Sequence, residues 1–313
     1  MKCKLEPKLK KLISKYQIKD HKICKLLIIR AVELSLVKLS KMGKIRGPLH
    51  TSVGQEAVAV SVCSNMKPED ALFSNHRGHG HYIGKDGNLS ELILELMGDK
   101  RGCCLGFGGS MHVADLKKNI IGSNGIVGAG VPIACGYSLG QTFKSINSIT
   151  VVFFGDGAIN QGVVMESMNM AAIYKLPILF VCENNFYAYS TKSNDVTKTP
   201  IYERAKGFGI ESFTINGMNL PQSFKKSKFA VNKVRKNKTP VFLEFKTYRF
   251  QRHFSNEQPK KIDYLDKKFH TKMINIDPCF IETKKKGLNK KNTIDLINNL
   301  IQIIVSKSLE WSR

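Results

Sequence analysis

The stretch that decides the fold is Val151–Thr191, which reads VVFFGDGAINQGVVMESMNMAAIYKLPILFVCENNFYAYST. The apolar run Ile149–Phe154 suits a buried parallel strand. Helical spacing follows over Gly162–Tyr174, and a second apolar run spans Ile178–Cys182. The apolar residues available for one face of this helix are Val163, Met170 and Ile173. Strand, helix and strand in this order predict one βαβ unit, and therefore an α/β protein with a mainly parallel sheet.

Polar groups follow both strands of this unit directly. Asp156 stands between Gly155 and Gly157, and Asn185 comes soon after the second strand. Ligands of open α/β sheets bind at the carboxyl ends of strands. Carboxylate and amide oxygens suit Mg²⁺, and glycines let backbone N–H groups approach a diphosphate. The pattern therefore predicts a metal–diphosphate site, although Gly-Asp-Gly alone also fits a tight turn capped by Asp156.

Composition excludes several other classes of protein. The chain has 313 residues, of which 42% are hydrophobic, so it is long enough for one large α/β domain with additions. Its eight cysteines are scattered without zinc-ligand spacing, which favours reduced thiols and a cytoplasmic location. The N-terminus lacks an apolar signal core, and no run approaches the roughly 18 apolar residues of a membrane span. We therefore expect no membrane association.

The formal net charge of +24 raises the question of a nucleic-acid partner. The lysines are spread along the chain, and no basic motif is interleaved with aromatic residues. We therefore interpret them as solvated faces that suit an acidic partner, and we expect no nucleic-acid binding. We predict three regions: a basic tail over residues 1–20, the α/β domain over 21–260, and a lysine-rich extension over 261–313 that ends in a helix packed on the same domain.

The remaining elements follow from periodicity and from capping signals. Further helices are predicted over His21–Met42, Gln55–Asn65, Asn88–Met97, Val131–Thr142, Pro221–Asn237 and Asn292–Trp311. Further strands are predicted over Ala71–Phe73, Ile210–Ile215 and Val241–Thr247. A loop rich in histidine and glycine surrounds His76 and Arg77, and Arg249 and His253 follow the last of these strands. Arginine matches phosphate geometry, so both segments are candidates for a ligand site.

Taken together, these motifs resemble the alpha subunits of thiamine-diphosphate-dependent 2-oxoacid dehydrogenases, the group that acts on pyruvate, acetoin and branched-chain substrates. The resemblance covers roughly residues 22–258. The matching motifs occur in the family's order, namely GQEA after His50, HRGHG, GGSMH, NGIVGAG, GDGAxNQG, KLP, ENNxYA and Tyr-Arg leading to His253. The resemblance implies the thiamine-diphosphate-binding fold, in which helices flank a mainly parallel sheet on both faces.

The resemblance also implies roles for individual residues. The side chains of Asp156 and Asn185 and the carbonyl of Tyr187 would bind Mg²⁺. The residues that would contact the cofactor are these three together with His76, Arg77, Gly125, Val127, Gly157, Ala158 and Arg249. His253 would act as a catalytic residue above the cofactor's reactive ring. His50 matches a catalytic histidine that contacts the substrate.

The implied activity is oxidative decarboxylation of a pyruvate-like 2-oxoacid, or acetoin cleavage, with transfer of the acyl group to a lipoyl-bearing acyltransferase. In this family the glutamate that activates the cofactor lies on a beta subunit, so the resemblance implies an α2β2 assembly. Glu56 and Glu166 are local carboxylates that we interpret as structural. Arg252 stands in place of a glycine of the family pattern, and Phe254 in place of a serine that is phosphorylated in mitochondrial relatives. We expect no kinase control at that position.

Two other functions fit parts of the sequence. One is the amino-terminal half of a split transketolase-like enzyme, against which Asn184 and the HRGHGH loop argue. The other is a catalytically silent subunit that binds the cofactor or supports assembly. The intact Asp156, Asn185 and His253 argue against it, whereas Arg252 and Phe254 favour it.

Overall fold

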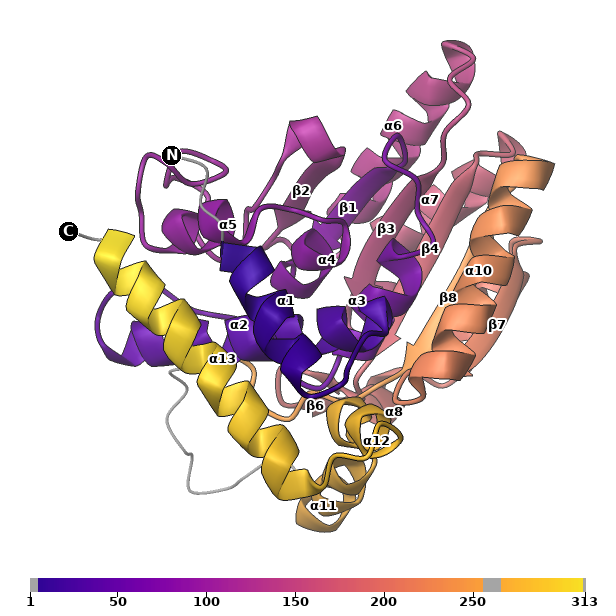
Figure 1. Ribbon diagram of the computed structural model, residues 1–313. Coiled ribbons are helices and arrows are strands. Elements are labelled where there is room, and N and C mark those ends of the chain that lie inside the picture. Colours follow the sequence, from indigo (N-terminus) through magenta and orange to yellow (C-terminus); the bar gives the residue numbers. More distant parts are fainter. Residues whose placement is uncertain (1–4, 256–265, 312–313) are drawn as a thin grey trace.

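The computed structural model describes residues 5–255 and 266–311 (Figure 1). A six-stranded sheet has the order β2-β1-β3-β4-β8-β7, and every neighbouring pair in it is parallel. Its strands are β1 (Ala71–Asn75), β2 (Ile120–Asn124), β3 (Thr150–Gly155), β4 (Ile178–Asn184), β7 (Glu211–Asn216) and β8 (Val241–Lys246). A short antiparallel pair, β5 (Tyr187–Ala188) and β6 (Thr191–Lys192), follows β4. The predicted α/β class is confirmed.

Helices cover both faces of the sheet, because alternate residues of each central strand point into different cores. In β3, Val151 and Phe153 belong to the larger core, while Val152 and Phe154 belong to the smaller one. The larger core receives side chains from α1 (Leu5–Lys15), α2 (His21–Lys41), α3 (Glu56–Cys63), α4 (His79–Gly84), α5 (Leu89–Leu96), α10 (Leu220–Asn237), α12 (Pro278–Lys284) and α13 (Lys290–Trp311). The smaller core receives them from α6 (Gly130–Phe143), α7 (Gly162–Ile173) and α9 (Ile201–Lys206).

The remaining short elements are η1 (Leu116–Lys118), η2 (Ala158–Asn160), α8 (Ser193–Val196) and α11 (Lys267–Asn275). None of the helices within the described ranges is long and apolar enough to cross a membrane. The long helices predicted from periodicity are all present, with ends within a few residues of the predicted ones. Asn88 caps α5 as expected, since its side chain accepts hydrogen bonds from the backbone of Ser90 and Glu91.

The segment that we described as a basic tail is a packed helix. α1 lies beside α13 (Figure 1), and Leu9 and Ile13 are fully buried in the larger core. The lysines dominated the composition of this segment, but they lie on the outer face of an amphipathic helix. The boundary predicted at residues 260 and 261 lies outside the described residues.

The buried face of α7 also differs from the predicted one. Val164, Met168 and Ala171 are buried, whereas the side chain of Ile173 is 66% exposed. The helix is apolar around most of its circumference, so periodicity alone did not single out a face. α7 packs beside α6, and that contact decides which side is buried. The outward apolar side chains are therefore available to a partner.

β2 was not predicted, because its sequence, IIGSN, reads as part of a glycine-rich loop. It pairs with β1 at the sheet edge, and the register shifts between Leu72 and Phe73. This strand carries Asn124 to the same end of the sheet as Asn75.

Candidate active site

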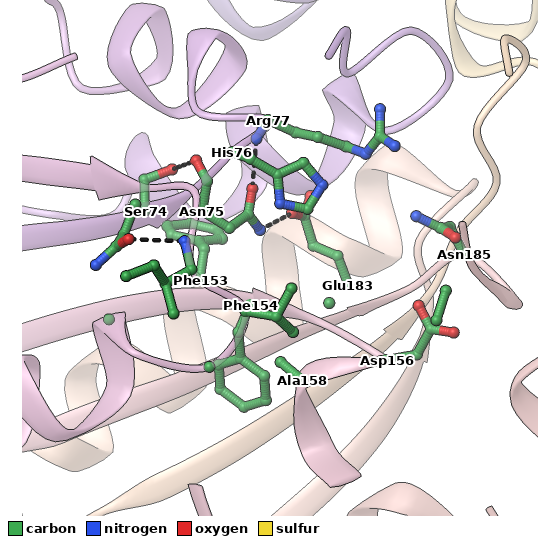
Figure 2. A pocket seen from close by; sticks show the side chains of 18 of the residues that line it. Ser74, Asn75, His76, Arg77, Phe153, Phe154, Asp156, Ala158, Glu183 and Asn185 are labelled. Atoms are coloured by element: carbon green, nitrogen blue, oxygen red, sulfur yellow. Dashed lines mark hydrogen bonds between the residues drawn. The ribbon is translucent and has the colours of Figure 1, made fainter. Parts of the chain in front are cut away.

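A pocket of about 310 Å³ lies at the carboxyl ends of the parallel strands (Figure 2). The ends of β1, β3 and β4 and the connection from β2 to α6 line it, together with His253. Gly155 on β3 pairs with Glu183 on β4, so the Gly-Asp-Gly turn and the Glu-Asn-Asn segment lie next to each other. This arrangement places the candidate site at the edge where open α/β sheets bind ligands.

Asp156 and Asn185 lie close together and are both buried (Figure 2). Burial raises the pKa of Asp156 to about 6, although hydrogen bonds from the Ser193 side chain and the Asn185 backbone oppose this shift. Its Oδ2 atom has no hydrogen-bond partner among the described residues. A buried carboxylate oxygen without a donor is costly, and a bound cation would satisfy it.

At Gly157 the backbone packs closely against the neighbouring strand β5. A Cβ atom at this position would lie 2.7 Å from the Cβ of Ala188, so a larger residue would displace the neighbouring strand. Gly157 and Ala158 both line the pocket, and the short helix η2 starts at Ala158. This turn therefore brings backbone groups to the position where a diphosphate was predicted to bind.

Three histidine rings pack against one another beside the pocket. The ring centroid of His50 lies 4.9 Å from that of His76 and 4.8 Å from that of His253. Burial and the nearby positive charge of Arg77 lower all three pKa values, to about 4 for His50, about 2 for His76 and about 3 for His253. The imidazoles are therefore neutral near pH 7.

Two arginines lie next to this cluster. Arg77 donates to the carbonyl oxygens of Thr51 at 2.8 Å and of His253 at 2.9 Å, and its Nη2 lies 3.2 Å from His253 Nδ1. Because a guanidinium only donates, Nδ1 accepts in this contact and the ring proton resides on Nε2. Arg249 is almost fully buried and donates to the carbonyl of Tyr189. Arg77 thus sets the tautomer of His253.

The structure gathers most of the predicted site residues around one pocket. Those that line it are His76, Arg77, Val127, Asp156, Gly157, Ala158, Asn185, Tyr187 and His253. Gly125, Arg249 and His50 are not among the lining residues. His50 contacts the pocket through the rings of His76 and His253.

Six polar lining residues were not predicted as site residues: Gln55, Ser74, Asn75, Asn124, Glu183 and Tyr189. Glu183 Oε2 lies 3.4 Å from Asn75 Nδ2 and 3.4 Å from His81 Nε2, and the His81 ring stacks on Phe153. Asn75 and Glu183 both stand at strand ends, and this position was the signal that could have identified them. Gln55 belongs to the GQEA motif, which marked this segment, but no role in the site was assigned to it.

A parallel α/β sheet that gathers a carboxylate, an amide, arginines and neutral imidazoles at its carboxyl edge is typical of enzymes that bind an anionic ligand. Residues 24–273 match the family model of the dehydrogenase E1 component. The chain belongs to this family, and membership implies thiamine diphosphate as its cofactor.

Relatives of known function agree with this assignment. The alpha subunit of acetoin:2,6-dichlorophenolindophenol oxidoreductase from Bacillus subtilis (strain 168) is 37% identical over 78% of this chain and 75% of its own length. The corresponding subunit from Cupriavidus necator is 41% identical over 69% of this chain and 65% of its own length. The pyruvate dehydrogenase E1 component subunit alpha of Rickettsia felis is 35% identical over 98% of this chain and 94% of its own length. The predicted family and enzyme class, an oxidoreductase alpha subunit of the pyruvate and acetoin type, are confirmed.

Proposed function

We propose that this chain is the alpha subunit of a 2-oxoacid dehydrogenase that binds Mg²⁺ and thiamine diphosphate and acts together with a beta subunit. Its reaction is oxidative decarboxylation of a pyruvate-like 2-oxoacid, or acetoin cleavage, with transfer of the acyl group to a lipoyl-bearing acyltransferase. The observation that carries the proposal is the buried Asp156 carboxylate, whose Oδ2 atom has no partner among the described residues and which lies beside Asn185 at the pocket.

The donor set fits the metal and the diphosphate. One carboxylate, one amide oxygen and a backbone carbonyl leave room for phosphate oxygens and water, which is the combination that Mg²⁺ prefers. Asp156, Asn185 and Tyr187 would hold the metal, and all three line the pocket. The backbone at Gly157 and Ala158 and the charges of Arg77 and Arg249 would face the diphosphate. Bound there, the cofactor supplies the electron sink that decarboxylation requires.

The histidine cluster places uncharged hydrogen-bonding groups beside the proposed cofactor site. His253 lines the pocket, and burial and Arg77 lower its pKa to about 3, so the ring is neutral near pH 7 and its Nε2–H can donate a hydrogen bond to negative charge that develops in the reaction. Arg77 holds the ring with Nδ1 as the acceptor. His50 and His76 pack against it and exclude water from one side of the ring. The substrate would bind between these rings and the cofactor.

The exposed apolar surface around the pocket is an argument for a partner subunit. Ile126 and Val127 line the pocket and are 72% and 49% exposed. On the adjacent α6 and α7, Ile133, Phe143 and Ile173 are also exposed. Exposed apolar side chains on neighbouring elements are typical of protein interfaces. The relatives are named as alpha subunits, which implies a partner for those proteins. A beta subunit seated here would close the pocket and bring in the activating glutamate.

The metal assignment is tested by replacing Asp156 with Ala in the enzyme assembled with its beta subunit. Calorimetry should show that Mg²⁺-dependent binding of thiamine diphosphate is lost, because no carboxylate remains to hold the metal. Asp295→Ala is the matched control, since Asp295 is exposed on α13, and it should bind normally. Unchanged binding by the Asp156 variant would refute the assignment.

A further inference from the structure

Gln55 joins two segments of the site that are far apart in the sequence. It is the residue before α3, it is 1% exposed, and it lines the pocket. Its Oε1 atom accepts a hydrogen bond of 3.1 Å from Nδ2 of Asn185, which follows β4. Its backbone N–H donates to the carbonyl of Ser52 at 2.8 Å. The side chain of Gln55 therefore bridges the start of α3 and the proposed metal ligand.

The orientation of the Asn185 amide decides whether it can bind a cation. Its Nδ2 faces Gln55, and its Oδ1 accepts the backbone N–H of Tyr187 at 3.2 Å. A carboxamide oxygen has two acceptor positions, so one is left for a metal ion. Rotation of the amide by half a turn would place its NH₂ group where the oxygen is needed. An acceptor at Gln55 and a donor at Tyr187 both oppose that rotation.

The segment that carries Gln55 is rigid. Gly54 has a φ of +101°, and a Cβ atom there would lie 2.2 Å from the carbonyl oxygen of Tyr248. Position 54 therefore requires glycine. Glu56 is fully buried, and its carboxylate accepts from Arg30 at 3.0 Å and from the backbone of Gly54 at 2.9 Å. These contacts hold the backbone on both sides of Gln55, so the base of its side chain stays beside Asn185.

We propose that Gln55 is a positioning residue, whose side-chain oxygen holds the Asn185 amide with Oδ1 directed toward the divalent cation of the cofactor site. The inference rests on the proposed function, because it needs Asn185 to bind a metal. Residues that orient metal ligands in this way typically change metal affinity by about 10- to 100-fold when they are replaced. Gln55 acts through Asn185 and leaves the reacting atoms untouched.

The test is a double-mutant cycle in the enzyme assembled with its beta subunit. Gln55→Met keeps the length of the side chain and removes its acceptor. At a fixed concentration of thiamine diphosphate, it should raise the Mg²⁺ concentration that gives half-maximal binding of thiamine diphosphate by about 10- to 100-fold. Asn185→Asp has two equivalent oxygens, so its orientation no longer matters. In the Asn185→Asp variant, Gln55→Met should change this half-maximal Mg²⁺ concentration by less than about threefold.

Two controls separate this role from a loss of folding. Gln141 is another buried glutamine, bonded to Ser148 and Thr150 away from the pocket, and Gln141→Met should leave the Mg²⁺ requirement unchanged. The melting temperature without cofactor should be the same for the Gln55 and Gln141 variants. If Gln55→Met does not fold, Gln55→Leu enters the same cycle.

The outcomes distinguish the inference from the proposed function. If Gln55→Met binds Mg²⁺ as the wild type does, or if it has an equal effect in both backgrounds, Gln55 does not orient Asn185 and the inference is overturned. If the wild-type enzyme itself shows no Mg²⁺-dependent binding of thiamine diphosphate, the proposed function fails instead.

Discussion

Asp156 and His253 show how burial sets the chemistry of single residues in this site. Burial disfavours the charged form of both groups, so it raises the pKa of the Asp156 carboxyl and lowers that of the His253 imidazole. The first group gains from a nearby cation, whereas the second stays uncharged near pH 7. The same desolvated pocket thus prepares one residue for metal binding and keeps the other as a neutral hydrogen-bond donor through Nε2–H.

His253→Gln should keep cofactor binding and lower turnover. Glutamine preserves a polar side chain of similar size but lacks the imidazole ring and its Nε2–H donor, so we expect kcat to fall by on the order of 10²-fold or more at pH 7. Because burial and Arg77 lower the pKa of His253 to about 3, this loss should be constant between pH 6 and 8. Steady-state kinetics and calorimetry would measure the two effects. Turnover equal to that of the exposed control His21→Gln would remove His253 from the mechanism.

At the scale of secondary-structure elements, a buried ion cluster joins three helices behind the pocket. Arg30 on α2 contacts Glu56 at the start of α3 and Asp277 at the start of α12. The distances are 3.0 Å to Glu56 Oε2 and 2.8 Å to Asp277 Oδ2. The reading of Glu56 as structural agrees with this contact. The cluster fixes the residue next to Gln55, so helices outside the sheet help to set the geometry of the site.

Arg30→Met should strongly destabilise the chain. Removal of the cation leaves two buried carboxylates without a counter-charge, and breaking a buried pair in this way costs about 3–5 kcal/mol. Urea unfolding of the full chain would measure the change. Lys307→Met is the comparison, because it breaks an ion pair with the 56% exposed Glu310 side chain and should cost less than about 1 kcal/mol. An Arg30 variant as stable as the Lys307 variant would contradict this account.

At the scale of the whole molecule, the exposed apolar side chains of α6 and α7 continue from the mouth of the pocket. α6 also carries Gly136 and Gly140, at which an added Cβ atom would meet nothing within 4 Å. A helix with small residues on its outer side allows another backbone to approach closely. This surface is the one on which we propose that the beta subunit docks.

Ile133→Glu should therefore block assembly while the chain stays folded. A carboxylate in the middle of an apolar contact loses hydration without gaining a partner. Size-exclusion chromatography of the co-expressed subunits should show the complex lost, with the circular dichroism of the chain unchanged. Ile294→Glu on α13 is the matched control, since Ile294 is 40% exposed and Ile133 is 54% exposed. Normal assembly of the Ile133 variant would place the partner elsewhere.

Most of the fold could be predicted from the sequence, because the central strands are short apolar runs and the long helices carry periodic or capping signals. Two failures have a physical cause. β2 contains glycine and a serine, and only pairing with β1 makes it a strand. α7 is apolar on most sides, so its contact with α6 was needed to decide the buried face.

For the site, the sequence by itself determined the family and the residues of the local motifs, such as Asp156 and Asn185. These residues stand directly at strand ends, and their chemistry depends on types and spacing that a linear sequence preserves. Only the tertiary structure decided that Gln55 reaches Asn185, that Glu183 meets His81, and that His50 packs on His253. These contacts join segments distant along the chain, and the order of strands in the sheet, which no local pattern encodes, brings them together.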